Sequence, residues 1–244
     1  MIHYHGSPIT PNAAAAKVLQ GKHSFVSFSC VDQLDIARDV CQSFALDNGA
    51  FSAWMAGNPV KDWSKYYSWV EQNKRYPGFD FAVIPDVIDG NEQDNDSLIN
   101  EWPHAKHQSA VVWHMHESID RLVKLANEWP LVAIGSSGEF AIVGNTKWWQ
   151  RINTALNAIC VDGQPICKLH GLRMLNPEVF TKIPFSSADS TSVGRNVGID
   201  SAWKGTFQPP DKEWRALILA ARIEAFNSAN FWQQQPEQDE LCLF

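Results

Sequence analysis

Long apolar runs are missing from this sequence, since no stretch approaches the ~18 residues that a membrane-spanning helix needs. The N-terminus also lacks the basic and then apolar order of a signal peptide. Cysteine is sparse: five residues, none in a CxxC pair, predict reduced thiols and no sequence-local zinc knuckle. We therefore expect a cytoplasmic protein with no membrane partner, no bound metal and no cofactor.

A strongly basic balance is missing as well. The 20 Lys and Arg residues are outnumbered by 27 Asp and Glu residues, which gives a net charge of −7. This charge argues against a broadly basic nucleic-acid binder and leaves room only for a local basic patch. What the chain does have is apolar residues, 45% of the total with 11 Trp, enough for a substantial core in one barrel or two small domains.

Short apolar runs alternate with helical patterns along the chain, which is typical of β/α units around a parallel sheet. The predicted strands are 2–6, 24–29, 43–47, 79–84, 110–116, 131–134, 166–173 and 184–188, and the predicted helices are 12–20, 31–42, 61–74, 119–128 and 148–160. Eight strands is the count of a (β/α)8 or TIM barrel. We predict one such α/β domain over residues 1–230 without a zinc-binding subdomain, followed by a polar tail over residues 231–244.

Polar residues gather where the predicted strands end. They are Asp47, Asp86, His116, Gly135, His170 or Arg173, and Asp189. The carboxyl ends of barrel strands form the face on which such enzymes build their active sites. Burying an unpaired charge is costly, so Asp189 at the end of an apolar run either has a function or caps the next helix. Six strand ends occupied in this way favour an enzyme site.

Four short motifs then follow one another in order on matching strands. They are Leu46-Asp47-Asn48-Gly49-Ala50-Phe51, Pro85-Asp86, Ile134-Gly135-Ser136-Ser137-Gly138-Glu139, and Ala188-Asp189-Ser190 with Gly194-Arg195-Asn196 behind it. Together they resemble the tRNA-guanine transglycosylases over most of residues 43–198. The chain departs from that family by its shorter length, by lacking a cysteine and histidine zinc site after Asp189, and by a histidine in place of the family's fifth-strand glutamine. With these differences, the chain resembles the compact phage-type branch of the superfamily, whose members insert 7-deazaguanine bases into DNA.

The resemblance implies a base exchange in which guanine in nucleic acid is replaced by a 7-deazaguanine derivative such as preQ0. Asp189 is then the nucleophile that forms a covalent glycosyl-aspartate, and Asp47 is the acid that protonates the departing purine. The partners are nucleic acid, DNA in preference to tRNA, and the free 7-deazaguanine base. A phage-encoded chain of this kind works in the host cytoplasm.

The base-binding residues follow from the chemistry of guanine, whose N1–H and amine are adjacent donors that one carboxylate accepts side by side. Asp86 is predicted for that role, beside Asn48, while backbone N–H groups of Gly135 and Ser136 hold the carbonyl oxygen. Further candidates are Phe51 and Met174 as a sandwich for the base, with core packing as the alternative, and His114 and His116 at its edge or 7-substituent. Arg195, Arg173 and Lys204 are candidates for phosphate contacts, with solvated surface as the alternative for Lys204.

Other interpretations remain open at this stage. His3, His5, His116, His170 and Asp189 imitate the metal-ligand pattern of amidohydrolase barrels, in which a divalent metal activates water. A non-enzymatic barrel that binds a deazapurine or nucleic acid is a third interpretation. The polymer, the exact 7-substituent, and a homodimer or partner protein that supplies basic surface are also left open by the sequence.

Overall fold

The computed structural model describes residues 1–198 and 203–233, and in them eight parallel strands close into a barrel. The strands are β1 (Ile2–Gly6), β2 (His23–Ser27), β3 (Ser43–Asp47), β4 (Phe79–Val83), β5 (Ser109–His114), β6 (Leu131–Gly135), β9 (Lys168–Gly171) and β10 (Ser187–Ser190). Each strand pairs with its neighbours in chain order, and β10 pairs with β1 to close the ring. The predicted TIM barrel is confirmed.

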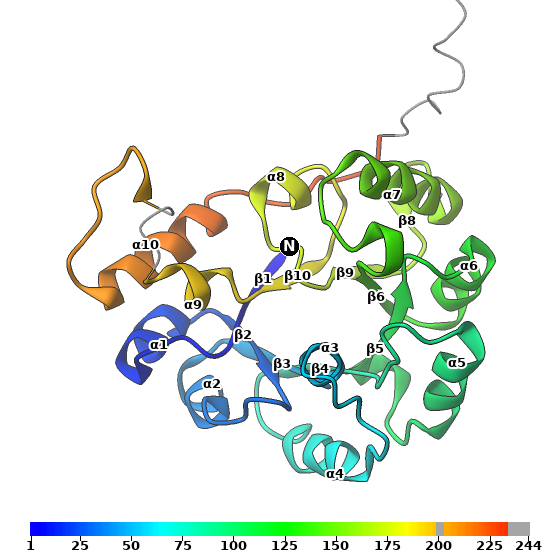
Figure 1. Ribbon diagram of the computed structural model, residues 1–244, viewed down its shortest axis with the longest axis horizontal. Helices are drawn as coiled ribbons and strands as arrows, with labels where there is room; N and C mark the ends of the chain where they lie inside the picture. Colours follow the sequence, from blue (N-terminus) through cyan, green and yellow to red (C-terminus); the bar gives the residue numbers. More distant parts are fainter. Residues whose placement is uncertain (199–202, 234–244) are drawn as a thin grey trace, which may run out of the picture.

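Helices surround this ring (Figure 1). They are α1 (Asn12–Leu19), α2 (Leu34–Val40), α3 (Ala50–Met55), α4 (Ser64–Asn73), α5 (Glu92–Glu101), α6 (Ile119–Glu128), α7 (Thr146–Ile159), α8 (Pro177–Phe180), α9 (Ser192–Asn196) and α10 (Lys212–Glu224). A two-stranded hairpin of β7 (Cys160–Val161) and β8 (Gln164–Pro165) follows α7. None of the described helices is long and apolar enough to cross a membrane.

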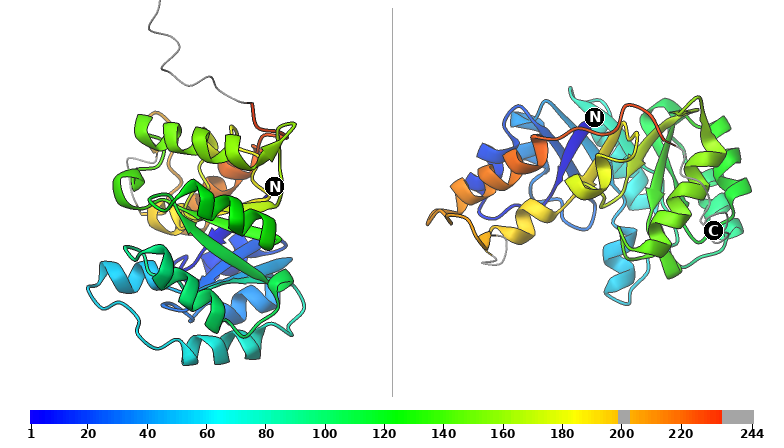
Figure 2. Two further views of the ribbon diagram at one scale, coloured as in Figure 1. Left: turned by 90° about the vertical axis from the view of Figure 1, so that its right-hand side faces the viewer. Right: turned by 90° about the horizontal axis from the view of Figure 1, so that it is seen from above.

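Helix α3 lies apart from the others, in front of the strand ring in Figure 1. Figure 2 shows it projecting from the side of the barrel opposite the N-terminus, which is the side where the strands end. Its start depends on Gly49, whose φ of 78° lies in the left-handed region that favours glycine. The turn from β3 into α3 therefore follows Asp47 directly and fixes that aspartate at the barrel mouth.

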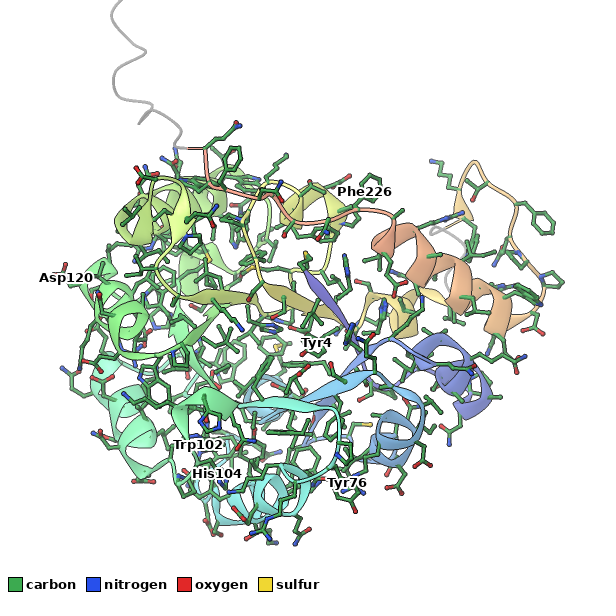
Figure 3. The ribbon with its side chains drawn as sticks, turned by 180° about the vertical axis from the view of Figure 1, so that it is seen from behind. Tyr4, Tyr76, Trp102, His104, Asp120 and Phe226 are labelled. Atoms are coloured by element: carbon green, nitrogen blue, oxygen red, sulfur yellow. The ribbon has the colours of Figure 1, made fainter. Side chains whose placement is uncertain are left out.

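Side-chain alternation decides which residues fill the barrel. Tyr4 packs inside it against Phe25 and Phe81, with its hydroxyl on Asp80, and Figure 3 shows it near the centre of the ring. His170 joins this cluster and stacks on Phe25 with ring centroids 5.2 Å apart. These side chains fill the barrel interior below the strand ends.

Because side chains alternate along β1, the side chains of His3 and His5, on either side of Tyr4, lie on the outer face of the barrel. His5 Nε2 meets Glu224 Oε1 of α10 at 2.7 Å, and Lys22 binds the other oxygen of the same carboxylate. His3 Nε2 lies 3.0 Å from the Phe226 carbonyl oxygen. The first strand is thus tied to the C-terminal helix on the outer face of the barrel.

The element boundaries differ from the sequence prediction in places. The seventh and eighth strands are shorter and begin later than predicted, and β5 ends at His114 rather than at residue 116. Helices α5 and α10 were not predicted; α5 carries mostly polar residues and is held by a capping box in which Asn91 and Asp94 bond to each other's backbone. Packing also continues past residue 230, since Trp232 is buried and its indole N–H donates to Asn157. Residues 234–244 of the predicted tail lie outside the described part.

Candidate functional site

A cavity of about 490 Å³ opens at the carboxyl ends of the strands. It brings together most of the side chains nominated from the sequence: Asp47, Asn48, Phe51, Asp86, His114, Gly135, Ser136, Arg173, Asp189 and Arg195. These residues come from β3, β4, β5, β6, β9 and β10 or the turns that follow them, so the barrel topology alone assembles them. The cavity is therefore the candidate active site.

Asp189 on β10 has one oxygen held and one oxygen free. Its Oδ1 accepts the backbone N–H of Arg173 at 2.9 Å and lies 3.3 Å from His170 Nε2. The other nitrogen of His170 lies 2.8 Å from Ser187 Oγ, which fixes the ring inside the barrel. Among the described residues Oδ2 has no hydrogen-bond partner. An aligned carboxylate with a free oxygen in a cavity has the geometry of a nucleophile.

Arg173 donates that backbone bond from an unusual conformation, since its φ is 58°. A non-glycine residue in the left-handed region is uncommon and persists where its surroundings hold it. Its guanidinium lies 3.6 Å from the ring centroid of Phe51 and 3.5 Å from the Ser136 carbonyl oxygen. Burial lowers the pKa of Arg173 somewhat, and Asp189 acts in the opposite direction. The side chain is thus pinned across the cavity rim as a cation.

Asp47 follows β3 and faces the same cavity. Burial raises the pKa of Asp47 to about 7, and the negative charges of Asp189 and Asp86 add to the rise. Hydrogen bonds from Ser27 and from the Gly49 backbone N–H (3.2 Å) act in the opposite direction. A carboxyl group that is half protonated near neutral pH is suited to give and take a proton.

Asp86 is 8% exposed and sits between an amide and an imidazole. Its Oδ1 accepts from Asn48 Nδ2 at 2.7 Å, and Asn48 also donates to the Ile84 carbonyl oxygen at 2.9 Å. His114 Nε2 lies 2.9 Å from Asp86 Oδ2, but the angle of the contact is not that of a hydrogen bond. Asp86 is therefore fixed in position with spare acceptor capacity on both oxygens.

A buried network that the sequence did not reveal supports this wall. Glu117 accepts the His114 backbone N–H (2.9 Å), the Arg121 guanidinium (3.0 Å) and the amide of Asn95 (2.9 Å). Asn95 in turn accepts the backbone N–H of Val87 at 2.8 Å, next to Asp86. The one sequence feature that could have indicated this network is the spacing of Glu117 and Arg121, which are four residues apart at the start of a helix and can form an ion pair. The network joins the ends of β4 and β5.

Three nominated residues lie elsewhere. Met174 is fully buried and packs behind the wall against Gly171, so it does not line the cavity and Leu172 does. The predicted sandwich of the base by Met174 and Phe51 is therefore wrong: one partner is absent, and Arg173 covers a face of the Phe51 ring.

His116 does not line the cavity either, because β5 ends at His114 and the chain turns before the alternation can repeat. It is exposed, with its ring nitrogens 2.7 Å from Ser137 Oγ and 3.0 Å from the Gly90 carbonyl oxygen. Lys204 is exposed in the turn before α10, away from the cavity lining, whereas Arg195 of α9 is exposed at the rim.

The ligand set of the amidohydrolase interpretation is not assembled. His3 and His5 point out of the barrel, and His170 and Asp189 lie inside it. Over residues 1–198 and 203–233 no group of three or more His, Cys, Asp or Glu side chains is placed to hold a metal ion.

Some residues of the site were not nominated from the sequence for the base exchange. The buried His170, which contacts Asp189 but does not line the cavity, had been noted only as a strand-end residue and a metal ligand. A row of hydroxyl groups from the ends of β1, β2 and β10 and the turns that follow them also lines the cavity. The row comprises Ser7, Thr10, Ser27, Ser29 and Thr191. Small hydroxyl residues are common in turns, so their type gave no signal of its own.

No family model matches the chain, and no curated protein matches it. The function is therefore inferred from the site itself.

Proposed function

We propose that this chain is a base-exchange transglycosylase that replaces guanine in nucleic acid with a 7-deazaguanine derivative. One observation carries the proposal: three carboxylates share a single cavity, and each has a different environment. Asp189 has a free oxygen, Asp47 has a pKa near 7, and Asp86 has fixed oxygens with spare acceptor capacity. A carboxyl group whose pKa is raised to about 7 by burial, beside a carboxylate with a free oxygen, supplies an acid and a nucleophile in one site.

The first half of the reaction breaks the bond between the sugar and guanine. Asp189 Oδ2 attacks C1′, the C1′–N9 bond breaks, and the bonding electrons leave with the base. Protonated Asp47 gives its proton to the departing base, which leaves as neutral guanine. The sugar then remains joined to Asp189 as an ester.

The second half reverses these steps with another base. The incoming 7-deazaguanine loses its N9 proton to ionised Asp47, and N9 attacks C1′. The ester bond breaks, and its electrons return to the Asp189 carboxylate. Both side chains end in their starting states, so the cycle needs no further reactant.

Recognition of the base is assigned to Asp86. Its carboxylate accepts N1–H and the amine of guanine, so a purine without these donors leaves buried acceptors unpaired and binds poorly. The target nucleotide must leave the stack to enter the cavity. Arg173 and Arg195 at the rim then face the sugar-phosphate backbone.

DNA is the proposed polymer and tRNA the alternative, on the resemblance to the compact phage-type branch. Incubation with radiolabelled guanine and either duplex DNA or tRNA tests this choice, and label is expected in DNA. Label in tRNA alone would move the activity to RNA, and label in neither would contradict the exchange. Exchange is also expected to survive exhaustive chelation, whereas loss with EDTA and rescue by zinc would favour the metal-dependent hydrolase.

A further inference from the structure

Helix α3 at the barrel mouth exposes apolar side chains that a soluble protein normally buries. Of its six residues only Ala50 is buried, whereas Trp54 is 37% exposed and Met55 is 64% exposed. Neighbouring large apolar side chains on a surface mark a place where another molecule binds. Phe51, Trp54 and Met55 are called the α3 surface below.

The contacts that hold α3 lie in its first turn. Asn48 Oδ1 accepts the backbone N–H of Ala50 at 2.7 Å, and the Arg173 guanidinium covers the Phe51 ring. The N-cap residue is a glycine without a side chain to cap the helix, and six residues are too few for a stable isolated helix. Trp54 and Met55, at the far end, thus add apolar surface to the mouth without being buried by the fold.

The α3 surface is continuous with the cavity. Phe51 lines the cavity, and its ring centroid lies 5.9 Å from that of Trp54, with the two planes 40° apart. Residues three apart lie on one face of a helix. The planar groups of Arg173, Phe51 and Trp54 therefore lead from the cavity to the projecting end of α3 (Figure 2). A long ligand with one group in the cavity has the α3 surface beside it.

The charges around α3 indicate the chemistry of that ligand. No charged residue occurs from Asn48 to Val60, in a chain with a net charge of −7, and Lys61 follows. Exposed arginines, Arg173 and Arg195, stand at the rim, while the three carboxylates of the site face the cavity. A nucleic acid fits this arrangement, because its bases stack on aromatic side chains and its phosphates bind arginines.

We propose that the α3 surface is a stacking platform for nucleic acid, on which Trp54 and Met55 bind a base next to the target nucleotide. The identity of the target rests on the proposed function. Stacking on Trp54 tolerates any sequence, because every base has a flat face. It holds the strand at the mouth and offsets part of the cost of taking the target out of its stack.

Fluorescence anisotropy with a fluorescein-labelled single-stranded DNA of mixed sequence tests the proposal. A strand of equal length whose sugars carry no bases is the comparison. Every chain in this assay also carries Asp189→Asn, so that no covalent adduct forms and binding alone is measured. Trp54→Ala should weaken binding of the normal strand about tenfold or more, and change binding of the abasic strand less than about twofold. An equal loss with both strands, or no loss with either, would overturn the proposal.

Matched variants separate stacking from other effects. Trp54→Phe keeps a flat ring and should bind the normal strand within about threefold of the Trp54 chain, so a loss as large as that of Trp54→Ala would contradict stacking. Phe226 is 52% exposed at the other end of the barrel, where its carbonyl oxygen contacts His3 (Figure 3), and Phe226→Ala should leave both strands bound as before. Arg195→Gln should weaken both strands alike and reduce the dependence on salt.

The exchange assay keeps this proposal apart from the proposed function. With Asp189 present, Trp54→Ala should raise the KM for the polymer about tenfold or more, with kcat and the affinity for free guanine within about twofold of wild type. Strand binding that depends on Trp54 without any exchange contradicts only the transglycosylase. Exchange with an unchanged KM contradicts only the α3 platform. A Trp54→Ala chain that sediments differently from wild type, with unaltered strand binding, would instead assign α3 to contact with a second copy.

Discussion

Two carboxylates on opposite sides of the barrel wall show how differently the chain treats its charges. Outside the wall, burial alone would raise the pKa of Glu224, but hydrogen bonds from His5 and Lys22 outweigh it and lower the pKa to about 2. Inside the mouth, burial raises the pKa of Asp47 to about 7, and in the described structure no Lys, Arg or His forms an ion pair with it. A paired carboxylate stabilises the fold, whereas an unpaired one costs stability and gains reactivity.

The separation of the outer ion pair from the residues inside the barrel depends on the alternation of side chains along β1. Tyr4 points into the barrel and His5 points out, so two adjacent residues serve different regions. The comparison predicts that substitutions in the mouth change activity with little loss of stability. Substitutions in the contact between β1 and α10 should lower stability with little change in activity.

The largest effect is expected for Asp189→Asn. Loss of the nucleophilic oxygen should lower base exchange by at least about a thousandfold, because no covalent glycosyl intermediate can form. The melting temperature should hardly change, since the amide oxygen still accepts the Arg173 N–H. Wild-type chain mixed with substrate should also give a nucleic-acid adduct that survives denaturation on a gel. Undiminished exchange by the variant would end the assignment of Asp189.

The next largest effect is expected for Asp47→Asn, which should slow exchange by roughly 10²–10⁴-fold. In the wild type, exchange should fall by up to about tenfold per pH unit above pH 7 as the Asp47 proton is lost, and this decline should be absent from the residual activity of the variant. A pH–rate profile measures both. An unchanged decline in the variant would assign the titration to another group.

The same variant tests the stability side of the comparison. The pKa of Asp47 is raised from its ordinary 3.8 to about 7, so its contribution to stability is present below pH 3.8 and is lost as pH rises through 7. At pH 8 the Asn variant, which carries no charge there, should melt about 2–4 °C higher than wild type, the shift that about 1 kcal/mol produces in a chain of this size. A lower melting temperature at pH 8 would mean that the hydrogen bonds of Asp47 matter more than its burial.

A smaller and more selective effect is expected for Asp86→Asn. The substitution turns one acceptor into a donor that faces the donors of guanine, at a cost of roughly 1–3 kcal/mol. Exchange should therefore decline more with guanine-type bases than with hypoxanthine-type bases, which lack the amine. The ratio of the two rates, measured beside a melting curve, decides the matter: an unchanged ratio with a lowered melting temperature would make Asp86 structural.

The sequence revealed the barrel and the carboxylates for one shared reason. Strands of a parallel barrel are short and apolar, so the charge that follows each of them is conspicuous, as with Asp47, Asp86 and Asp189. It misplaced His116 and Met174 because their positions depend on where a strand ends, and a shift of two residues removes a side chain from the cavity. The hydrogen bond between His5 and Glu224 joins residues that are 219 positions apart, so no local sequence pattern indicates it.

The smallest effect concerns that outer pair and leaves the active site alone. Glu224 has a folded pKa of about 2, below its ordinary 4.5, so its contribution to stability is present above pH 4.5 and is lost as pH falls toward 2. The side chain is 26% exposed, and solvent screening reduces the contribution to about 1–2 kcal/mol at pH 7. Glu224→Gln should therefore lower the unfolding free energy by that amount at pH 7, and the difference from wild type should shrink steadily below pH 4.5. Denaturant titrations at pH 7, 4 and 3 measure it.

Glu213→Gln is the matched control on the same helix: its partner Lys17 is largely exposed, so the substitution should change stability less. Base exchange should stay within about twofold of wild type in both variants, and a large loss in Glu224→Gln would show that the outer face and the mouth are coupled through β1.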